Sequence, residues 1–378
     1  MKVLHLGKFD TLGGIERHVR ALATGLAASG EASVVNLVSN DNSQSDRHTD
    51  YGYPTVRAAC WGTAFSLALS PTLPWLAHRL HREHRFDLVH LHFPDPLGHL
   101  TALTLPGVKR VISWHSDIIR QQTALKLYGP FMHPFVAGAD ALIGATPQHF
   151  SASTQIPPTG KPGQVRAVIP YGFDPAQMSW NPAAQARLEA LQAQAAGRRT
   201  VFTVGRHVYY KGYEVLIEAM RSVDALLWIG GTGPLGDALK AQAQAAGVAD
   251  RVIFTGRIPE EELVAYYRAC DVFTMPSTDR SEAFGLVQLE AMACGKPVVS
   301  TRLGNGVEYV NRDGETGLLV PPRNAAALAA ALNRLLGDAA LRARLGEAGR
   351  AWVEAGFSVP AMVDKTLAVY RQVLGRAA

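Results

Sequence analysis

Two carboxylates, Glu282 and Glu290, flank a short stretch in which a loop gives way to an apolar, helix-forming run. The Phe284-Gly285-Leu286 segment between them predicts a helix start. Free N–H groups at the positive end of a helix dipole attract phosphate. The pattern therefore predicts a nucleotide-sugar site in which Glu290 accepts hydrogen bonds from the ribose and Glu282 faces the sugar. The alternative is a solvated loop carboxylate and a helix carboxylate paired with a lysine such as Lys296.

Two cations, Arg206 and Lys211, follow an apolar run that ends in Gly205. A guanidinium gives bidentate hydrogen bonds to a phosphate, and an ammonium gives a point charge. Such a pair stabilises the negative charge that develops on a departing nucleoside diphosphate. Arg206, Lys211 and Glu282 are thus predicted catalytic residues, although a solvated surface position stays open for Lys211.

A glycine-rich stretch, Gly231-Thr-Gly233-Pro-Leu-Gly236, also follows an apolar run. A dinucleotide-binding site with this spacing needs a carboxylate at the end of the next strand. That strand, predicted over 251–255, is followed by Arg257 and Ile258, so an oxidoreductase is disfavoured. Gly233 is instead expected to let the backbone pass beside a nucleotide, with Arg257 and Ile258 near the base.

The first half of the chain carries polar residues where strands are predicted to end. Gly13 and Gly14 precede an amphipathic run and suit a diphosphate or an acceptor at a helix start, or an ordinary turn. His115 is expected to donate to a sugar hydroxyl or to the leaving oxygen, with Asp117 orienting it or binding the acceptor.

His90 and His92 also end a predicted strand. Their His-x-His spacing is compatible with a metal, but no third ligand stands at a matching spacing. They are interpreted as loop-positioning or acceptor-side groups.

Bulk properties favour a two-domain cytoplasmic protein. The chain has 378 residues, 47% of them hydrophobic, more than one core usually supports. It shows no signal peptide, no apolar run of membrane-spanning length, and three widely spaced cysteines typical of a reducing compartment. The net charge of +5 is modest and the basic residues are dispersed, so nucleic acid is not expected as a partner.

Apolar runs alternate with helix-length amphipathic segments from end to end, which predicts an α/β fold with two doubly wound parallel sheets. Strands are expected near 2–6, 33–38, 87–91, 109–113, 140–145, 165–169, 199–205, 225–230, 251–255, 271–275, 297–300 and 317–319. The domains are predicted over 1–180 and 181–358, and a C-terminal helix within 359–378 is expected to pack back on the first. Because ligands bind outside the carboxyl ends of such strands, the active site is expected in the cleft between the domains.

Taken together, these motifs resemble the large family 4 of retaining glycosyltransferases with the GT-B fold, two Rossmann-like domains facing each other across a cleft. The resemblance covers nearly the whole chain and is most specific from Glu282 to Glu290 and in the following Ala291-Met-Ala-Cys-Gly-Lys-Pro-Val298 run. It implies an N-terminal acceptor-binding domain and a C-terminal domain that binds the nucleotide-sugar donor. It also implies that the backbone of residues 284–286 helps to hold the donor and that His115 lies beside the transferred sugar.

One departure from the family pattern concerns Tyr171. Many relatives carry Pro-Asn-Gly-hydrophobic-Asp where this chain has Pro170-Tyr-Gly-Phe-Asp174, which puts any asparagine-specific contact in doubt. The Trp-His-Ser-Asp form at 114–117 looks like the bacterial branch that builds surface polysaccharides, often with mannosyl donors. This resemblance favours GDP-mannose over a UDP-linked sugar.

The predicted activity is transfer of a hexose, with retention, from a nucleoside-diphosphate sugar to a hydroxyl of a glycan or polyprenol-linked acceptor in polysaccharide or lipopolysaccharide synthesis. No Asp-x-Asp motif is present, so no metal and no cofactor are expected. The alternatives are a GT-B-like sugar-nucleotide epimerase or hydrolase, and a binding module without turnover. The mixed basic and apolar segments 75–85 and 118–128 suit either crossover helices or peripheral contact with an anionic membrane.

Overall fold

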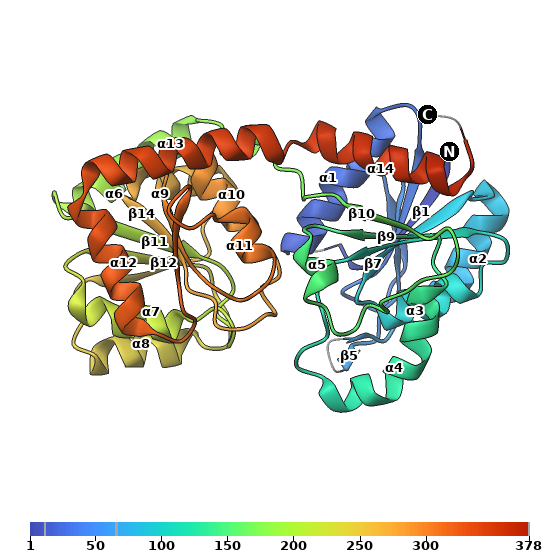
Figure 1. The fold of residues 1–378 in the computed structure, drawn as a ribbon, viewed down its shortest axis with the longest axis horizontal. Coiled ribbons are helices and arrows are strands. Elements are labelled where there is room, and N and C mark those ends of the chain that lie inside the picture. The colour runs from blue at the N-terminus through green and yellow to red at the C-terminus, as the bar shows by residue number, and fades with distance from the viewer. Residues whose placement is uncertain (11–12, 65–66, 377–378) are drawn as a thin grey trace. The chain divides into compact units, whose positions relative to one another are not determined.

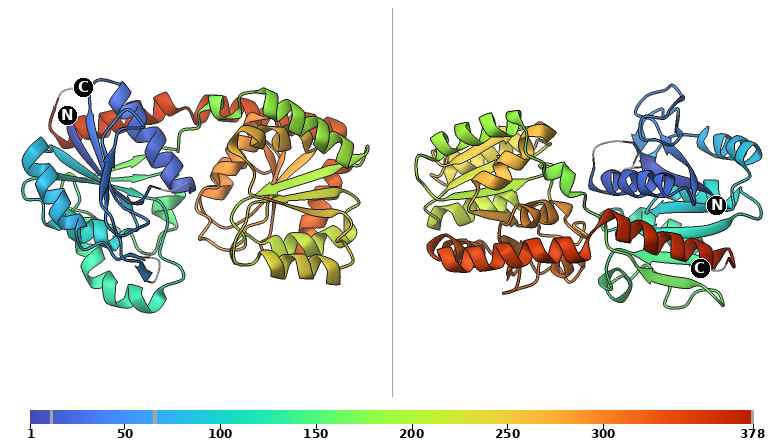
Figure 2. Two further views of the ribbon diagram at one scale, coloured as in Figure 1. Left: turned by 180° about the vertical axis from the view of Figure 1, so that it is seen from behind. Right: turned by 90° about the horizontal axis from the view of Figure 1, so that it is seen from above.

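A computed structural model describes residues 1–10, 13–64 and 67–376 (Figure 1, Figure 2). The chain divides into two compact units. Unit 1 comprises Met1–Gly172 and the segment from Val359 onward, and unit 2 comprises Phe173–Ser358. The chain leaves unit 1 at Gly172, earlier than the predicted residue 180. The reason is local, because Phe173 N–H donates to the Phe357 carbonyl of unit 2 at 2.6 Å.

Unit 1 is built on an eight-stranded sheet in the order β10-β9-β8-β7-β1-β2-β4-β3. Every pairing is parallel except that of β3 with β4. The strands are β1 (Lys2–Phe9), β2 (Ser33–Ser39), β3 (Asp46–His48), β4 (Thr55–Ala58), β7 (Leu88–Phe93), β8 (Lys109–Trp114), β9 (Ala141–Gly144) and β10 (Val165–Val168). A separate two-stranded ribbon pairs β5 (Thr63–Ala64) with β6 (Leu67–Ala68).

Two strands of this sheet, β3 and β4, were not predicted from the sequence, and a third, β1, is longer than predicted. Strand β3 lies at the sheet edge and is polar, and β4, between β2 and β3, has only four residues, so neither produces an apolar run. The Arg57 guanidinium of β4 contacts the Asp46 carboxylate of β3 at 2.7 Å. Strand β1 was expected to end near residue 6. It continues to Phe9 because pairing with β2 resumes after an irregularity between Leu6 and Phe9.

Helices cover both faces of the unit 1 sheet. They are α1 (Gly14–Ala28), α2 (Leu73–His84), α3 (Pro96–Leu103), α4 (Gln122–Ala137), α5 (Gln148–Ser151) and α14 (Val359–Val373). The last of these belongs to unit 1 and lies along α1, as Figure 2 shows. The contact is close, since a Cβ on Gly25 of α1 would meet Val363 of α14 at 2.4 Å. Residues 377–378 of the predicted terminal segment lie outside the described residues.

Unit 2 holds a six-stranded, fully parallel sheet in the order β13-β12-β11-β14-β15-β16. Its strands are β11 (Thr200–Val204), β12 (Leu226–Gly230), β13 (Val252–Gly256), β14 (Val272–Met275), β15 (Val298–Thr301) and β16 (Gly317–Val320). Its helices are η1 (Pro175–Met178), α6 (Pro182–Ala195), α7 (Tyr213–Ala219), η2 (Met220–Ser222), α8 (Gly236–Ala245), α9 (Glu260–Ala269), α10 (Leu286–Ala293), α11 (Gly306–Val310), α12 (Ala325–Gly337) and α13 (Ala339–Gly356).

Each sheet has a point where the strand order reverses. In unit 1 the first strand, β1, lies between β7 and β2; in unit 2 the first strand, β11, lies between β12 and β14. Doubly wound sheets bind ligands outside the carboxyl ends of the strands at such a point. The topology therefore marks one candidate site in each unit.

Among the described residues, no helix is both long enough and apolar enough to cross a bilayer.

Candidate active site

In unit 2, the loops that follow β11 and β14 meet at the reversal point, and Lys211 and Glu282 join them. The Lys211 ammonium lies 2.5 Å from the Glu282 carboxylate, and Ser277 Oγ donates to the same carboxylate at 3.2 Å. The Thr278 N–H donates to the Tyr210 carbonyl at 2.7 Å. The fold thus brings together two predicted site residues, Lys211 and Glu282, whose direct contact was not predicted, and it excludes a solvated surface position for Lys211.

Lys211 remains a cation in this setting. Burial alone would lower its pKa, but the neighbouring Glu282 carboxylate, with Tyr210 and Tyr213, outweighs burial and raises the pKa above the ordinary value. The Lys211 side chain is only 14% exposed. A fixed positive charge therefore stands at the carboxyl edge of the sheet, where an anionic ligand could exchange with Glu282 as its partner.

Two glycines allow the loops of unit 2 to approach this closely. Gly231 has a φ of +103°, and a Cβ on it would lie 2.1 Å from the Gly205 carbonyl oxygen. Gly212 has a φ of +70°, and its Cβ would lie 2.0 Å from the Pro276 carbonyl oxygen. Both positions combine a left-handed backbone with backbone contact, so a side chain would force the loops apart. Gly233, predicted to pass beside a nucleotide, is similarly close to the His207 backbone.

Helix α10 begins two residues later than the predicted Phe284. Gly285, with a φ of +78°, precedes its first residue, Leu286, and no side chain caps the helix start. The Phe284 side chain is buried in unit 2. The first backbone N–H groups of α10 thus follow the loop that carries Glu282, the arrangement that attracts an anion.

Glu290 lies within α10 and is 4% exposed. Its carboxylate accepts a hydrogen bond from the Tyr267 hydroxyl of α9 at 2.6 Å. Burial, followed by the adjacent Glu290 charge, raises the pKa of Tyr267 well above its ordinary value, so the phenol stays a donor. The contact with a ribose stays a prediction.

The remaining donor-site candidates of unit 2 are more peripheral. Arg206 follows β11 with an exposed side chain, and its charge acts on Tyr210 together with that of Lys211. Arg257 is exposed after β13, whereas Ile258 approaches Gly230 of β12. Arg206 lies on the loop after β11, and Arg257 and Ile258 lie on the loop after β13. Among the described contacts, none of the three shares the one between Lys211 and Glu282.

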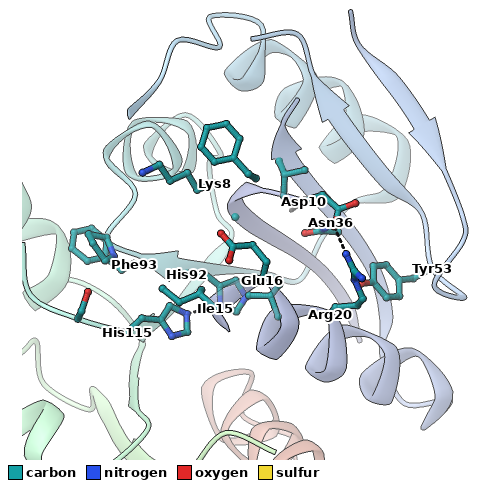
Figure 3. Close-up of a pocket in the computed structure, with 16 residues that line it drawn as sticks. Lys8, Asp10, Ile15, Glu16, Arg20, Asn36, Tyr53, His92, Phe93 and His115 are labelled. Atoms are coloured by element: carbon teal, nitrogen blue, oxygen red, sulfur yellow. Dashed lines mark hydrogen bonds and ion pairs between the residues drawn. The ribbon is translucent and has the colours of Figure 1, made fainter. Parts of the chain in front are cut away.

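Unit 1 has a pocket of about 220 Å³ at its own reversal point (Figure 3). Lys8 and Asp10 border it at the end of β1, Glu16 in α1, His92 in β7 and His115 after β8. Burial lowers the pKa of Lys8 and raises that of Glu16, which weakens both charges relative to exposed groups. A pocket with several polar groups and modest charge suits a hydroxyl-rich ligand.

The His115 ring has both nitrogens engaged inside unit 1. Nε2 lies 3.1 Å from His92 Nδ1, and Nδ1 lies 2.5 Å from the Tyr171 hydroxyl. Donation to a sugar hydroxyl, which stays a prediction, would require one of these contacts to be exchanged. The expectation that Asp117 orients His115 is wrong, because the Asp117 carboxylate accepts from Trp114 Nε1 at 3.0 Å and from Ser153 Oγ at 2.6 Å.

Gly13 and Gly14 lie at the start of α1 in unit 1, whereas the other predicted donor-binding residues lie in unit 2. No side chain caps α1, and a Cβ on Gly13 would collide with the Glu16 carboxylate. The missing side chain of Gly13 thus leaves room for Glu16 to fold back over the start of its own helix, beside the pocket.

The sequence did not single out His5, His18 and Tyr370, which the fold gathers around His90 and His92. His90 was predicted to be a loop-positioning or an acceptor-side group. The loop-positioning alternative is wrong, because His90 lies inside β7, is fully buried and contacts the Tyr370 hydroxyl at 2.6 Å. The acceptor-side alternative stays a prediction. The one available signal was the distribution of histidine, with twelve of thirteen before residue 180.

Two family models match the chain in tandem. "Glycosyltransferase Family 4" matches residues 12–177, and "Glycosyl transferases group 1" matches residues 188–352. The D-rhamnosyltransferase WbpZ of Pseudomonas aeruginosa is 36% identical over 350 residues, which span 89% of this chain and 86% of that protein. This chain belongs to the family 4 glycosyltransferases.

This glycosyltransferase has further relatives along its whole length. The O-antigen chain mannosyltransferase C of Escherichia coli is 29% identical over 379 residues, 99% of each chain. The solved structure of sucrose-phosphate synthase from Thermosynechococcus elongatus matches with a TM-score of 0.81 and 27% identity over 99% of each chain. The predicted GT-B fold is confirmed, and the fold and family together make this chain a glycosyltransferase.

Proposed function

We propose that this glycosyltransferase moves a hexose, with retention, from a nucleoside-diphosphate sugar held by unit 2 to a hydroxyl of an acceptor held by unit 1. The observation that carries the proposal is the pair formed by Lys211 and Glu282. It places a fixed cation and a carboxylate at the reversal point of the unit 2 sheet, beside the uncapped start of α10. Departure of a diphosphate needs cationic and N–H groups where its negative charge develops.

In the proposed reaction, the anomeric C–O bond breaks and its electron pair moves onto the diphosphate. Lys211, Arg206 and the first N–H groups of α10 stabilise that charge. Glu282, released from Lys211 by the phosphate, accepts hydrogen bonds from the donor sugar, and Glu290 accepts from the ribose. The acceptor hydroxyl attacks from the face that the diphosphate leaves and passes its proton to a leaving phosphate oxygen. This route needs no enzymatic nucleophile.

We propose mannose, delivered by GDP-mannose, as the transferred sugar, and a glycan or lipid-linked acceptor in surface polysaccharide synthesis. Support comes from two relatives, one named as an O-antigen chain mannosyltransferase and the other as a D-rhamnosyltransferase. Over half its length the chain is also 39% identical to a GDP-mannose-dependent phosphatidylinositol monomannoside mannosyltransferase of Mycolicibacterium smegmatis. A thermal-shift comparison of GDP, UDP and ADP tests the base, since a ligand of the folded state alone raises its stability.

We propose that the transfer is independent of metal, because Lys211, Arg206 and α10 can supply the charge stabilisation that a metal supplies elsewhere. Activity is expected to survive EDTA. Complete loss in EDTA, restored by Mg²⁺ or Mn²⁺, would refute metal independence.

The decisive experiment compares Lys211→Met and Glu282→Gln with Lys240→Met. Lys240 also pairs with a carboxylate of unit 2, that of Asp237 at 3.5 Å, but both side chains are exposed on α8. Loss of one fixed charge at a transition state lowers kcat about 100- to 1000-fold. We expect that loss in the first two variants and a change below twofold in the control. Wild-type rates in Lys211→Met would refute the site.

Product analysis separates the remaining activities. NMR of the anomeric proton tests retention. Sugar released to water without acceptor would indicate a hydrolase, and a changed sugar still bound to the nucleotide would indicate an epimerase. Donor binding without any product would indicate a binding module.

We also propose that the protein works at the cytoplasmic face of a membrane, which unit 1 contacts peripherally. Large apolar side chains are exposed on it: Trp75 of α2 (61%), Leu127 and Phe131 of α4 (76% and 70%) and Trp61 (71%). Basic Arg79 and Arg82 of α2 would meet anionic headgroups. Flotation with phosphatidylglycerol vesicles tests this, and equal flotation of a variant with Leu127 and Phe131 changed to serine would contradict it.

A further inference from the structure

Four histidines of unit 1 form a hydrogen-bonded chain that begins at the pocket wall. His115 Nε2 lies 3.1 Å from His92 Nδ1, and His92 Nε2 lies 3.0 Å from His5 Nδ1. His92 and His115 border the pocket, whereas His5 is fully buried in β1. The chain therefore leads from the pocket into the core of the sheet.

Two tyrosines extend this chain. The Tyr370 hydroxyl of α14 lies 3.4 Å from His5 Nε2 and 2.6 Å from His90 Nδ1, and His90 Nε2 lies 2.7 Å from Ser113 Oγ. At the pocket end, the Tyr171 hydroxyl lies 2.5 Å from His115 Nδ1. The chain thus runs between two phenols that are far apart in the sequence.

The contact distances indicate the direction in which hydrogen bonds are donated along this chain of histidines and tyrosines. A neutral imidazole donates through one nitrogen and accepts through the other. The contact of Tyr370 with His90 at 2.6 Å is shorter than the usual 2.7–3.2 Å of an N–H···O bond, and it fits a phenol O–H as the donor. The opposite direction would require Tyr370 to donate to His5 across 3.4 Å.

These donors together determine which nitrogen carries the proton in each imidazole ring. If Tyr171 donates to His115 Nδ1, the His115 proton is on Nε2 and points to His92, whose proton is on Nε2 and points to His5. The His5 proton is then on Nε2 and faces Tyr370. Tyr370 donates to the remaining ring, His90, which in turn carries its proton on Nε2 and donates to Ser113 Oγ.

We propose that Tyr171 and Tyr370 are positioning residues that hold His5, His90, His92 and His115 as neutral Nε2–H tautomers. The two pocket histidines then face a ligand with fixed ring orientations and with no ring nitrogen left to exchange a proton. The expected effect on use of the acceptor rests on the proposed function, whereas the assignment of the tautomers does not.

A metal ion is the competing occupant of the same cluster. Two sets of three histidines, His5 with His90 and His92, and His18 with His92 and His115, bring ring nitrogens within 4.8 Å of one another. Neither set, as described, includes a carboxylate or a thiolate, so these residues would offer a metal only neutral ligands. The nitrogen pairs at 3.0 and 3.1 Å already satisfy each other as N–H···N bonds.

The test is long-range ¹H–¹⁵N NMR of the full chain labelled in histidine, with each ring assigned by its loss in a single histidine variant. At pH 7 the wild type is expected to show four Nε2–H tautomers for the chain. In Tyr171→Phe, His115 and His92 should lose their single tautomer. Tyr128→Phe is the matched control, because its hydroxyl contacts His99 Nδ1 at 2.8 Å outside the chain; it should leave all four rings unchanged.

Activity supplies a second readout that a purely structural role would not move. In Tyr171→Phe, kcat/KM for the acceptor should fall about tenfold, as expected for misplaced pocket groups, while the donor-induced thermal shift stays at the wild-type value. Nδ1–H or imidazolium rings in the wild type would overturn the proposal. Displacement of the same resonances by equimolar ZnCl₂, or by EDTA dialysis of the purified protein, would assign the cluster to a metal instead. The wild-type spectrum decides the direction even if Tyr171→Phe fails to fold or donor binding is absent.

Discussion

Acidification should destabilise unit 1 far more than unit 2, because unit 1 buries neutral histidines. Burial lowers the pKa of His5 and His18 to about 3, and it lowers the pKa of His90, His92 and His115 well below the ordinary value. Each of these five residues is at most 5% exposed.

The direction of the pH effect on stability follows from the number of protons that the folded and unfolded states bind. The unfolded chain binds protons at these rings as the pH falls through about 6.5, whereas in the folded unit His5 and His18 do not until about pH 3, and the pKa values of the other three rings also lie well below 6.5. Between these values the unfolded state holds more protons, so stability falls as the pH falls. From pH 7 to pH 5.5 each ring costs about 1.2 kcal/mol, or about 6 kcal/mol for the five. Typical domains have only about 5–15 kcal/mol of stability.

Unit 2 contains one histidine, His207, whose lowered pKa acts in the same direction with a single ring. Urea titrations at several pH values, with pulse proteolysis and mass-spectrometric assignment of the cleavage sites, report the two units separately. Unit 1 should lose its urea resistance between pH 7 and 5.5, while unit 2 keeps most of its own. Equal pH dependence in both units would refute the reasoning.

Two single substitutions test how much one buried histidine contributes to this pH dependence. His18 Nδ1 has no hydrogen-bond partner among the described residues, so His18→Gln removes a buried ring without breaking a hydrogen bond at that atom, although it also removes the ring contact with Tyr171 at a centroid distance of 4.1 Å. The slope of the unfolding free energy against pH should fall by about 1.4 kcal/mol per pH unit below pH 6. His133→Gln, at an exposed position on α4, should leave the slope unchanged.

Two further predictions concern unit 2. Gly231→Ala should lower the unfolding free energy by more than about 2 kcal/mol and weaken donor binding, because its Cβ would collide with the Gly205 carbonyl. The control is Gly247→Ala, at a φ of +69° with open space around it. In the same urea titration it should show only the smaller cost of the unfavourable backbone conformation. Tyr267→Phe removes a hydrogen bond to the Glu290 carboxylate and should cost about 1.5–3 kcal/mol in that assay, whereas wild-type stability would show that this bond contributes nothing.

Local patterns were sufficient to predict most of the strands that build the two sheets. Parallel strands buried on both faces appear as continuous apolar runs, as β7 and β12 do, and the sequence located them within a few residues. The same logic failed for β3, where the strand lies at the sheet edge and its residues are polar. Edge strands need few apolar side chains, so they leave little signal.

The candidate site of unit 2 was more predictable than that of unit 1. Lys211 and Glu282 stand on loops directly after strands, so adjacency of β11 and β14 was enough to bring them together. The partners of Glu290 and Asp117 were not foreseen, because the Tyr267 hydroxyl and the Ser153 hydroxyl reach them from helix and loop positions with no sequence motif. Side-chain contacts between elements depend on packing that periodicity does not encode.

The histidine chain shows where local patterns stop being sufficient. His90 and Tyr370 are 280 residues apart, and only the return of α14 to unit 1 brings them to 2.6 Å. His-x-His spacing alone suggested a metal, a loop-positioning role or an acceptor-side role, and none of these interpretations anticipated a buried tyrosine between two imidazoles. A helix that looks like a terminal appendage thus supplies a hydroxyl to the row of rings behind the pocket. Changes in α14 should therefore alter the pocket through Tyr370, although no residue of that helix lines it among the residues described.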